Sequence, residues 1–404
     1  MNKTWPLTLI LGGLAMIGPF SIDTYLPSFP AIAQEFKVDP ILVQQTLSVY
    51  LFAFAFMMLF YGTLSDSFGR RPVILGALLL YSVASLGAVF APSLAWLVAF
   101  RALQGLSAGA GMVVGRAMVR DRVSGADAQR MLSQIVMVFG IAPAIAPILG
   151  GWLHVAFGWR SVFIFLTFIG VSMFVVCYRA LPESLPTLAR QAFNFANIAT
   201  NYCKAFRHPQ FILLSLAIGF AFSAFGLYIA AAADFMIVVL HLPETAFGWL
   251  FIPLVSGMML GAALSGRSAG KVLPRAMIAN GYSLMIIAAA WNIAYNLFFV
   301  AAVPWAVLPL MLYTFGLALI MPNMTLLGLD LFPKTAGLAA SLQSFVQTMV
   351  FSLVAGLVAP LLFGSALKMA IGTSVGLVLS LICWALANRR TLNMQPQKEN
   401  RNVS

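Results

Sequence analysis

Charge is what this sequence has least of. Only 8% of its 404 residues are Asp, Glu, Lys or Arg, while 61% are hydrophobic. A soluble domain needs far more charge to cover its surface. The shortage therefore excludes a large soluble protein, and it makes any charge inside an apolar stretch informative.

Residues and motifs that signal metal, disulfide or nucleotide chemistry are also scarce. The three cysteines (Cys177, Cys203 and Cys383) have neither disulfide nor metal-ligand spacing, so we expect free thiols. The three histidines lie far apart, which disfavours a metal site. The chain lacks the G-x-x-x-x-G-K-[ST] phosphate-binding loop, so we expect no ATP hydrolysis. We also expect no covalent catalysis and no cofactor.

Long apolar runs recur along the whole chain. Each has about 20 residues, the helix length that crosses a hydrocarbon core of about 30 Å. The strands of a barrel would alternate, whereas these runs are continuously apolar, so only helices fit. The sequence predicts an all-α membrane protein with twelve spans, over residues 7–29, 41–65, 72–91, 94–117, 130–152, 159–180, 211–238, 245–266, 275–297, 304–327, 336–363 and 367–387.

Basic residues indicate on which side of the membrane each loop lies. With the N-terminus inside, most of the 23 lysines and arginines fall in cytoplasmic segments or at their helix ends. The positive-inside rule therefore predicts that both termini are cytoplasmic. Because these charges are scattered over many short loops, the net charge of +12 implies no nucleic-acid partner.

The longest cytoplasmic loop, Leu181–Gln210, separates six spans from six. We expect an N-terminal six-helix bundle over 1–180, a linker over 181–210, a C-terminal six-helix bundle over 211–387 and a cytoplasmic tail over 388–404. Short matches relate the halves, such as Ala146-Pro147 in span five and Ala359-Pro360 in span eleven. Two pseudo-symmetric bundles of this kind enclose a site near the membrane midplane and rock about it.

The short turn between spans two and three carries an ordered set of glycines and charges: Gly62, Asp66, Gly69, Arg70 and Arg71. The two glycines permit a close helix reversal. Asp66 can face a helix N-terminus, and Arg70 can pair with an acid, for which Asp121 is the candidate. This pattern predicts a conformational switch loop; a plain basic anchor is the alternative, since cytoplasmic loops carry arginines in any case.

Span five carries a second ordered set: Gly140, Pro143, Pro147, Gly150 and Gly151. The prolines cannot donate backbone hydrogen bonds, so the helix bends or loosens there. The glycines allow a partner helix to pack closely. We interpret this set as a hinge or seal between the halves, with ordinary small-residue packing as the alternative.

Four runs together resemble the major facilitator superfamily of secondary transporters. The loop from Gly62 to Pro72 is similar to its signature loop, and Arg101-Ala-Leu-Gln-Gly to its fourth-helix motif. The run Gly140–Gly151 is similar to the fifth-helix motif of its drug/proton antiporters, although Gly140 and Pro143 replace a tight glycine–proline pair. Ser21-Ile-Asp-Thr-Tyr-Leu-Pro resembles the first helix of the Bcr/CflA subfamily. The resemblance implies a bacterial inner-membrane transporter in which the first-helix acid and fourth-helix arginine are functional.

Two charges lie inside apolar spans. Asp23 is about 16 residues, or roughly 24 Å, from the cytoplasmic start of span one, and Arg101 is about 7 residues, or roughly 10 Å, from the outer start of span four. Both therefore fall in the outer half of the membrane, where they can share a cavity. Burial favours a neutral carboxyl and a nearby guanidinium favours a charged one, so small movements can switch it. We predict that Asp23 and Arg101 couple transport to protons; a static structural ion pair is the alternative.

Uncharged polar residues in or near the spans are candidates for a substrate cavity: Tyr25, Gln104, Gln134, Asn323 and Gln347. Each could instead bond to nearby backbone. Asp234 is a third candidate for a functional intramembrane charge, but its place near the outer end of span seven favours a helix cap or a water-facing position.

These observations predict a monomeric, proton-driven exporter of small apolar or amphipathic compounds, whose partners are its substrate, protons and membrane lipids. Three alternatives stay open. One is an exporter dedicated to one metabolite, such as a siderophore or nucleoside. The second is a proton-coupled importer, and the third is a membrane receptor or enzyme that transports nothing.

Overall fold

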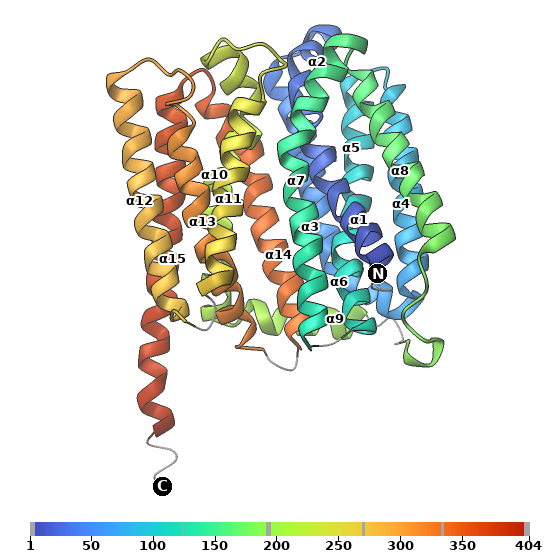
Figure 1. Ribbon diagram of the computed structural model, residues 1–404, viewed down its shortest axis with the longest axis vertical. Helices are drawn as coiled ribbons and strands as arrows, with labels where there is room; N and C mark the ends of the chain where they lie inside the picture. Colours follow the sequence, from blue (N-terminus) through green and yellow to red (C-terminus); the bar gives the residue numbers. More distant parts are fainter. Residues whose placement is uncertain (1–4, 124, 191–194, 269–270, 333–334, 400–404) are drawn as a thin grey trace.

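The computed structural model describes residues 5–123, 125–190, 195–268, 271–332 and 335–399. Within these residues, twelve helices are long and apolar enough to cross a membrane. They confirm the predicted all-α membrane fold. Figure 1 shows them standing side by side, with the helices from α1 to α8 in one half of the molecule and those from α10 to α15 in the other.

The elements of the first half are α1 (Trp5–Asp23), η1 (Leu26–Ser28), α2 (Phe29–Phe36), α3 (Pro40–Phe68), α4 (Arg70–Val89), α5 (Leu94–Ala108), α6 (Ala110–Arg122), α7 (Gly125–Phe157) and α8 (Arg160–Ala180). The linker contains η2 (Thr187–Ala189) and α9 (Phe195–Phe206). The second half contains α10 (Pro209–Ala230), η3 (Asp234–Val239), α11 (Gly248–Ser268), α12 (Pro274–Phe298), α13 (Leu308–Leu329), α14 (Ala336–Leu353), η5 (Val354–Val358), η6 (Ala359–Leu362) and α15 (Ala366–Glu399).

Several predicted spans are not single straight helices. The first is broken after Asp23, and η1 and α2 carry it to Phe36, beyond the predicted end at residue 29. The fourth is divided between α5 and α6 at Gly109. The seventh ends at Ala230 rather than at residue 238, and the π-helical turn η3 follows. Pro27 in the first span and Gly109 in the fourth weaken the regular hydrogen-bond ladder of an α-helix, whereas the end of the seventh span carries neither residue type.

The two halves touch along two helix pairs, α3 with α14 and α7 with α11. Near the ends of these helices that lie opposite the linker, on the predicted outer side, Gln45 Nε2 donates to Gly356 O at 2.8 Å, and Ser352 Oγ donates to Ser48 O at 2.9 Å. His154 Nε2 lies 3.1 Å from Glu244 Oε2 across the same boundary. We call this set of contacts the outer seam; it joins the two halves on the side opposite the linker.

The linker helix α9 lies across the other end of the molecule, from which α15 also projects (Figure 1). It packs against α10 and α14, while Tyr202 Oη donates to Leu59 O of α3 at 2.7 Å. The linker thus contacts both halves on the predicted cytoplasmic side. The helix α15 continues to Glu399, so the first part of the predicted tail extends the last span.

Candidate functional site

Asp23 is the last residue of α1, at the point where the first span breaks. It is buried, with 3% of its surface exposed, and faces neither bulk solvent nor lipid headgroups. No hydrogen bond or ion pair joins its carboxyl to another residue in the described part of the chain. The predicted intramembrane acid is therefore enclosed but has no fixed donor.

Arg101, on α5, is fully buried close to the same helix end. Its Nη1 donates to Ser21 O at 3.0 Å and to Gln104 Oε1 at 2.8 Å. Ser21 lies in the last turn of α1, where backbone carbonyls lack helical partners and the helix dipole is negative. The guanidinium thus binds a broken helix end, which is a favourable place for a cation.

The direct Asp23–Arg101 ion pair that depth matching suggested is absent from this structure. One nitrogen of Arg101, Nη1, donates to the Ser21 carbonyl and the Gln104 side-chain amide. The other two, Nε and Nη2, have no acceptor among the described residues. The guanidinium lies over two aromatic rings instead: its carbon is 4.3 Å from the ring centre of Tyr50 and 4.8 Å from that of Tyr25. Depth along a span could not predict this, because it says nothing of rotation about the helix axis.

A chain of buried hydrogen bonds supports this arrangement from α4. Gln104 Nε2 donates to Ser85 Oγ at 2.7 Å, and Ser85 Oγ donates to Tyr81 O at 2.8 Å. The Tyr81 hydroxyl in turn lies 2.6 Å from Ser21 Oγ. The network therefore fixes Gln104, Arg101 and the end of α1 relative to one another.

The predicted cavity residues fall into two groups. Tyr25 and Gln104 are fully buried partners of Arg101 and line no open space in this structure. Gln134 and Gln347 are half-buried on α7 and α14, and Asn323 Nδ2 donates to Leu319 O of its own helix at 2.8 Å. The structure brings only the first two together with Asp23, so a shared cavity for all five stays a prediction.

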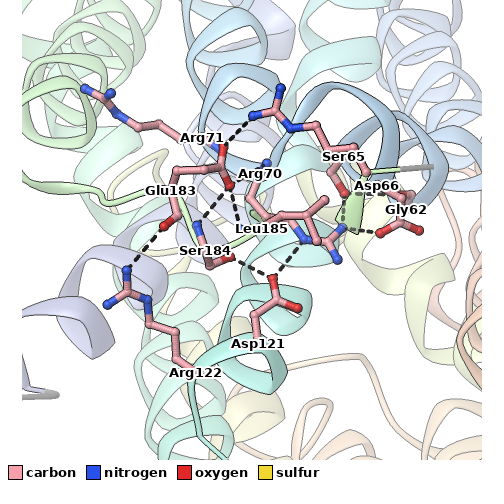
Figure 2. Close-up of polar contacts among 11 residues, drawn as sticks. Gly62, Ser65, Asp66, Arg70, Arg71, Asp121, Arg122, Glu183, Ser184 and Leu185 are labelled. Atoms are coloured by element: carbon pink, nitrogen blue, oxygen red, sulfur yellow. Dashed lines mark hydrogen bonds and ion pairs between the residues drawn. The ribbon is translucent and has the colours of Figure 1, made fainter. Parts of the chain in front are cut away.

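The switch loop is an ion-pair clamp between the ends of α3 and α6 on the linker side of the molecule (Figure 2). Arg70 Nη1 lies 2.6 Å from Asp66 Oδ1 and donates to Ser65 Oγ at 2.6 Å. Arg70 Nε donates to Asp121 Oδ2 at 3.1 Å, so the expected acid partner is present. At Gly62, the expected close approach is not seen, because an added Cβ would meet nothing within 4 Å.

Glu183, in the linker, is a member of this clamp that sequence reasoning missed. Its carboxylate accepts from the backbone N–H groups of Arg70 at 3.1 Å and of Arg71 at 3.2 Å. These groups begin α4, so Glu183 places a negative charge at the positive end of that helix. Gly69 has φ +99°, and an added Cβ there would lie 2.6 Å from Glu183 Oε2. The available signal was that Glu183 is the single acid in the basic linker.

Contacts around Glu183 extend the clamp to the linker. Ser184 Oγ donates to Asp121 Oδ2 at 2.7 Å, and Arg71 Nη2 donates to Tyr178 O at 2.5 Å (Figure 2). The first residues of the linker, directly after α8, are therefore hydrogen-bonded to the ends of α4 and α6.

Two neighbouring glycines of α7 make close backbone contacts, one beside Asp23 and the other at the outer seam. A Cβ on Gly150 would collide with the backbone of Thr24, the neighbour of Asp23, and one on Gly151 would collide with the backbone of Glu244 in the second half. Gly140 has open space around it, and α7 stays helical through Pro143 and Pro147. Close packing is thus found at two of the three predicted glycines.

Asp234 lies outside the spans and accepts a hydrogen bond from Gly364 N at 2.8 Å. Burial raises the pKa of this carboxyl, and the hydrogen bond from Gly364 opposes that rise. The contact joins η3 to the loop before α15 and caps neither element, because Gly364 precedes the first turn of α15 and Asp234 lies within η3.

Twelve membrane-spanning helices in two contacting halves, with a charged clamp at one end and buried charges within, define the class of multi-pass secondary transporters. Residues 11–360 match the family model described as the Major Facilitator Superfamily. The chain belongs to this superfamily, as the four sequence runs indicated.

Curated relatives match most of the chain. The bicyclomycin resistance protein homolog of Haemophilus influenzae is 28% identical over 84% of this chain and 85% of its own length. The multidrug resistance protein D of Escherichia coli is 28% identical over 83% and 84%. The multidrug transporter MdfA of Yersinia pestis is 29% identical over 81% and 79%.

Solved structures share the fold at low sequence identity. A bacterial homologue of the human lysosomal transporter Spinster superposes with a TM-score of 0.74 at 16% identity, covering 97% of this chain and 99% of that one. A D-xylose-proton symporter superposes with a TM-score of 0.71 at 15% identity, covering 95% and 98%.

Proposed function

We propose that this protein exports small apolar or amphipathic compounds across a bacterial inner membrane in exchange for protons. Relatives named for bicyclomycin and multidrug resistance support this direction and substrate class. In this proposal the protein is a monomeric transporter rather than an enzyme, and the proton gradient replaces a cofactor as the energy source. Both termini lie in the cytoplasm, as the distribution of basic residues favours.

The observation that carries the proposal is the environment of Asp23. A buried, ionised carboxylate without a hydrogen-bond donor is costly. In the structure, Asp23 has no donor and Arg101 is engaged elsewhere, so this state suits a protonated Asp23. If Arg101 or water reaches the carboxyl in another state, the proton is released there.

Coupling follows when substrate and proton favour different states. A substrate that binds more tightly when Asp23 is ionised lowers the affinity for the proton, and the proton lowers the affinity for substrate by the same factor. Opening toward the outside must separate the outer seam, including the contacts Gln45–Gly356 and His154–Glu244. The switch loop at the opposite end then stabilises one arrangement of the cytoplasmic helix ends.

The function is tested with inside-out membrane vesicles whose lumen is acidified. A panel of unrelated toxic compounds is added, and the internal pH and compound uptake are followed with and without an uncoupler. The proposal expects uptake of several compounds, loss of protons from the lumen on their addition, and no accumulation with the uncoupler. Uptake of a single metabolite would indicate a dedicated exporter, the opposite direction of flux an importer, and unchanged pH with every compound a protein that does not transport by this mechanism.

A further inference from the structure

The guanidinium of Arg101 is held between two tyrosine rings from different helical segments. Tyr50 comes from α3, and Tyr25 from the turn that follows α1; both are fully buried. Each ring has its own anchor, since Tyr50 Oη donates to Gly18 O at 3.4 Å and Tyr25 Oη lies 2.9 Å from Thr46 Oγ1. We call this arrangement the tyrosine clamp.

The clamp leaves much of the hydrogen-bonding capacity of Arg101 unused. Only Nη1 has acceptors, while Nε and Nη2, which carry three of the five N–H donors of a guanidinium, have none among the described residues. Buried unsatisfied donors of a charged group are expensive, so a compensating attraction must hold the guanidinium there. Cation–π attraction to the two rings supplies it, and it is strongest where water is excluded.

An acceptor with unused capacity follows the helix end that this cation binds, and Tyr50 interacts electrostatically with both groups. Asp23 follows two residues after Ser21, whose carbonyl Arg101 already binds, and its carboxyl has no donor. The ionisable groups that act on Arg101 are Tyr25 after α1, Tyr50 on α3 and Tyr81 on α4, and Tyr50 also faces Asp23 at the end of α1. Asp23 is the carboxyl in this set, and therefore the natural alternative partner for the free N–H groups when the helix end or the guanidinium moves.

We propose that Tyr25 and Tyr50 are positioning residues that hold the Arg101 guanidinium off Asp23 while that carboxyl is protonated, and release it when the proton leaves. The inference rests on the proposed function, because it assumes that Asp23 exchanges protons. In addition, the strength of the tyrosine clamp, and not only the distance between Asp23 and Arg101, sets the pH at which Asp23 exchanges its proton. A weaker clamp lets Arg101 approach Asp23 more readily, so the carboxyl gives up its proton at lower pH.

Fluorination of the ring at position 50 tests the proposal without changing its size. Tyr50→Phe keeps the ring, and mono-, di- and trifluorophenylalanine then weaken its attraction for a cation in steps. We expect the midpoint of the pH dependence of proton-coupled uptake in vesicles to stay near the wild-type value in the phenylalanine variant. It should then move progressively to more acidic pH, by about one pH unit across the series.

Tyr50→Leu removes the ring altogether, and Tyr313→Leu is its matched control. Tyr313 on α13 is also buried, and its hydroxyl also donates to a backbone carbonyl, that of Ala221 at 3.1 Å. Among the described residues, no arginine lies over its ring. Both variants lose a buried ring, so we expect both to lower the melting temperature, and Tyr50→Leu alone to move the pH midpoint.

The outcomes separate this inference from the function it rests on. A pH midpoint that does not change along the fluorine series overturns the clamp, and so does an equal shift in the Tyr313→Leu variant. If Asp23→Asn abolishes coupling while the fluorine series has no effect, the proposed function stands and the clamp alone is wrong. The fluorinated rings are close to phenylalanine in size and all lack the hydroxyl, so the comparison within that series does not depend on whether the leucine variants assemble.

Discussion

Replacement of Gly151 by alanine should open the outer seam. In the structure, the Cβ of an alanine at this position would lie 3.2 Å from the carbonyl carbon of Glu244 and 3.3 Å from Thr245 Cα, and it would collide with the Glu244 carbonyl oxygen. Carbon atoms pack best at about 3.5–4.0 Å. Both elements present backbone, which cannot swing aside as a flexible side chain can, so α7 and the loop before α11 must move apart.

The size of the effect follows from overpacking. Forcing one methyl group into a closed contact costs about 1–3 kcal/mol. Because Gly151 and Glu244 belong to different halves, this cost falls on the closed seam and is relieved when the halves separate. The equilibrium should therefore shift toward the outward-open state by between about 5-fold and 150-fold.

The assay is the rate at which a cysteine in the outer seam reacts with a membrane-impermeant maleimide. Ser352→Cys, in a chain whose three native cysteines are replaced, suits this purpose because Ser352 is buried at the seam and bonds to Ser48 O. Gly140→Ala is the matched control, since it lies on the same helix with nothing within 4 Å of the added Cβ. Labelling of the Gly151→Ala protein at the rate of the Gly140→Ala control would refute the reasoning.

Two further predictions concern neighbouring contacts. Gly150→Ala places its Cβ 2.7 Å from Thr24 Cα, within the same half. We therefore expect it to impair proton coupling in vesicles and to leave the maleimide labelling rate unchanged. A labelling rate that rises as in Gly151→Ala would show that the two glycines do not act separately. Glu183→Gln removes the charge from the N-terminus of α4, an effect of about 1–2 kcal/mol in a half-buried site. We expect faster hydrogen exchange at the Arg70 and Arg71 amides and slower transport, whereas unchanged exchange at those amides would contradict the assigned role of Glu183.

Sequence patterns predicted the fold well because the membrane imposes it. Runs of apolar residues must be helical in lipid, so length and hydropathy alone gave all twelve spans. The switch loop was also predictable in part, because Arg70 and Asp121 are charges that need partners at the same membrane face. Glu183 was missed because its partners are backbone N–H groups more than a hundred positions away, and sequence shows no pattern for such a contact.

The sequence pointed to the two buried charges but could not predict their contacts. Asp23 and Arg101 stood out because isolated charges in lipid are rare. Which groups they contact depends on the break after Asp23 and on the rotation of α5, both set by packing between helices. For the same reason, the sequence could not distinguish Gly140, which faces open space, from Gly150, which meets backbone.

The most direct test of the central claim is proton release from the purified protein when a transported compound binds, followed with a pH indicator in weakly buffered detergent solution. The account predicts that the wild-type protein and an Asp234→Asn control release protons, and that Asp23→Asn binds the same compound with no release. Proton release from Asp23→Asn equal to that of the wild type would contradict the account.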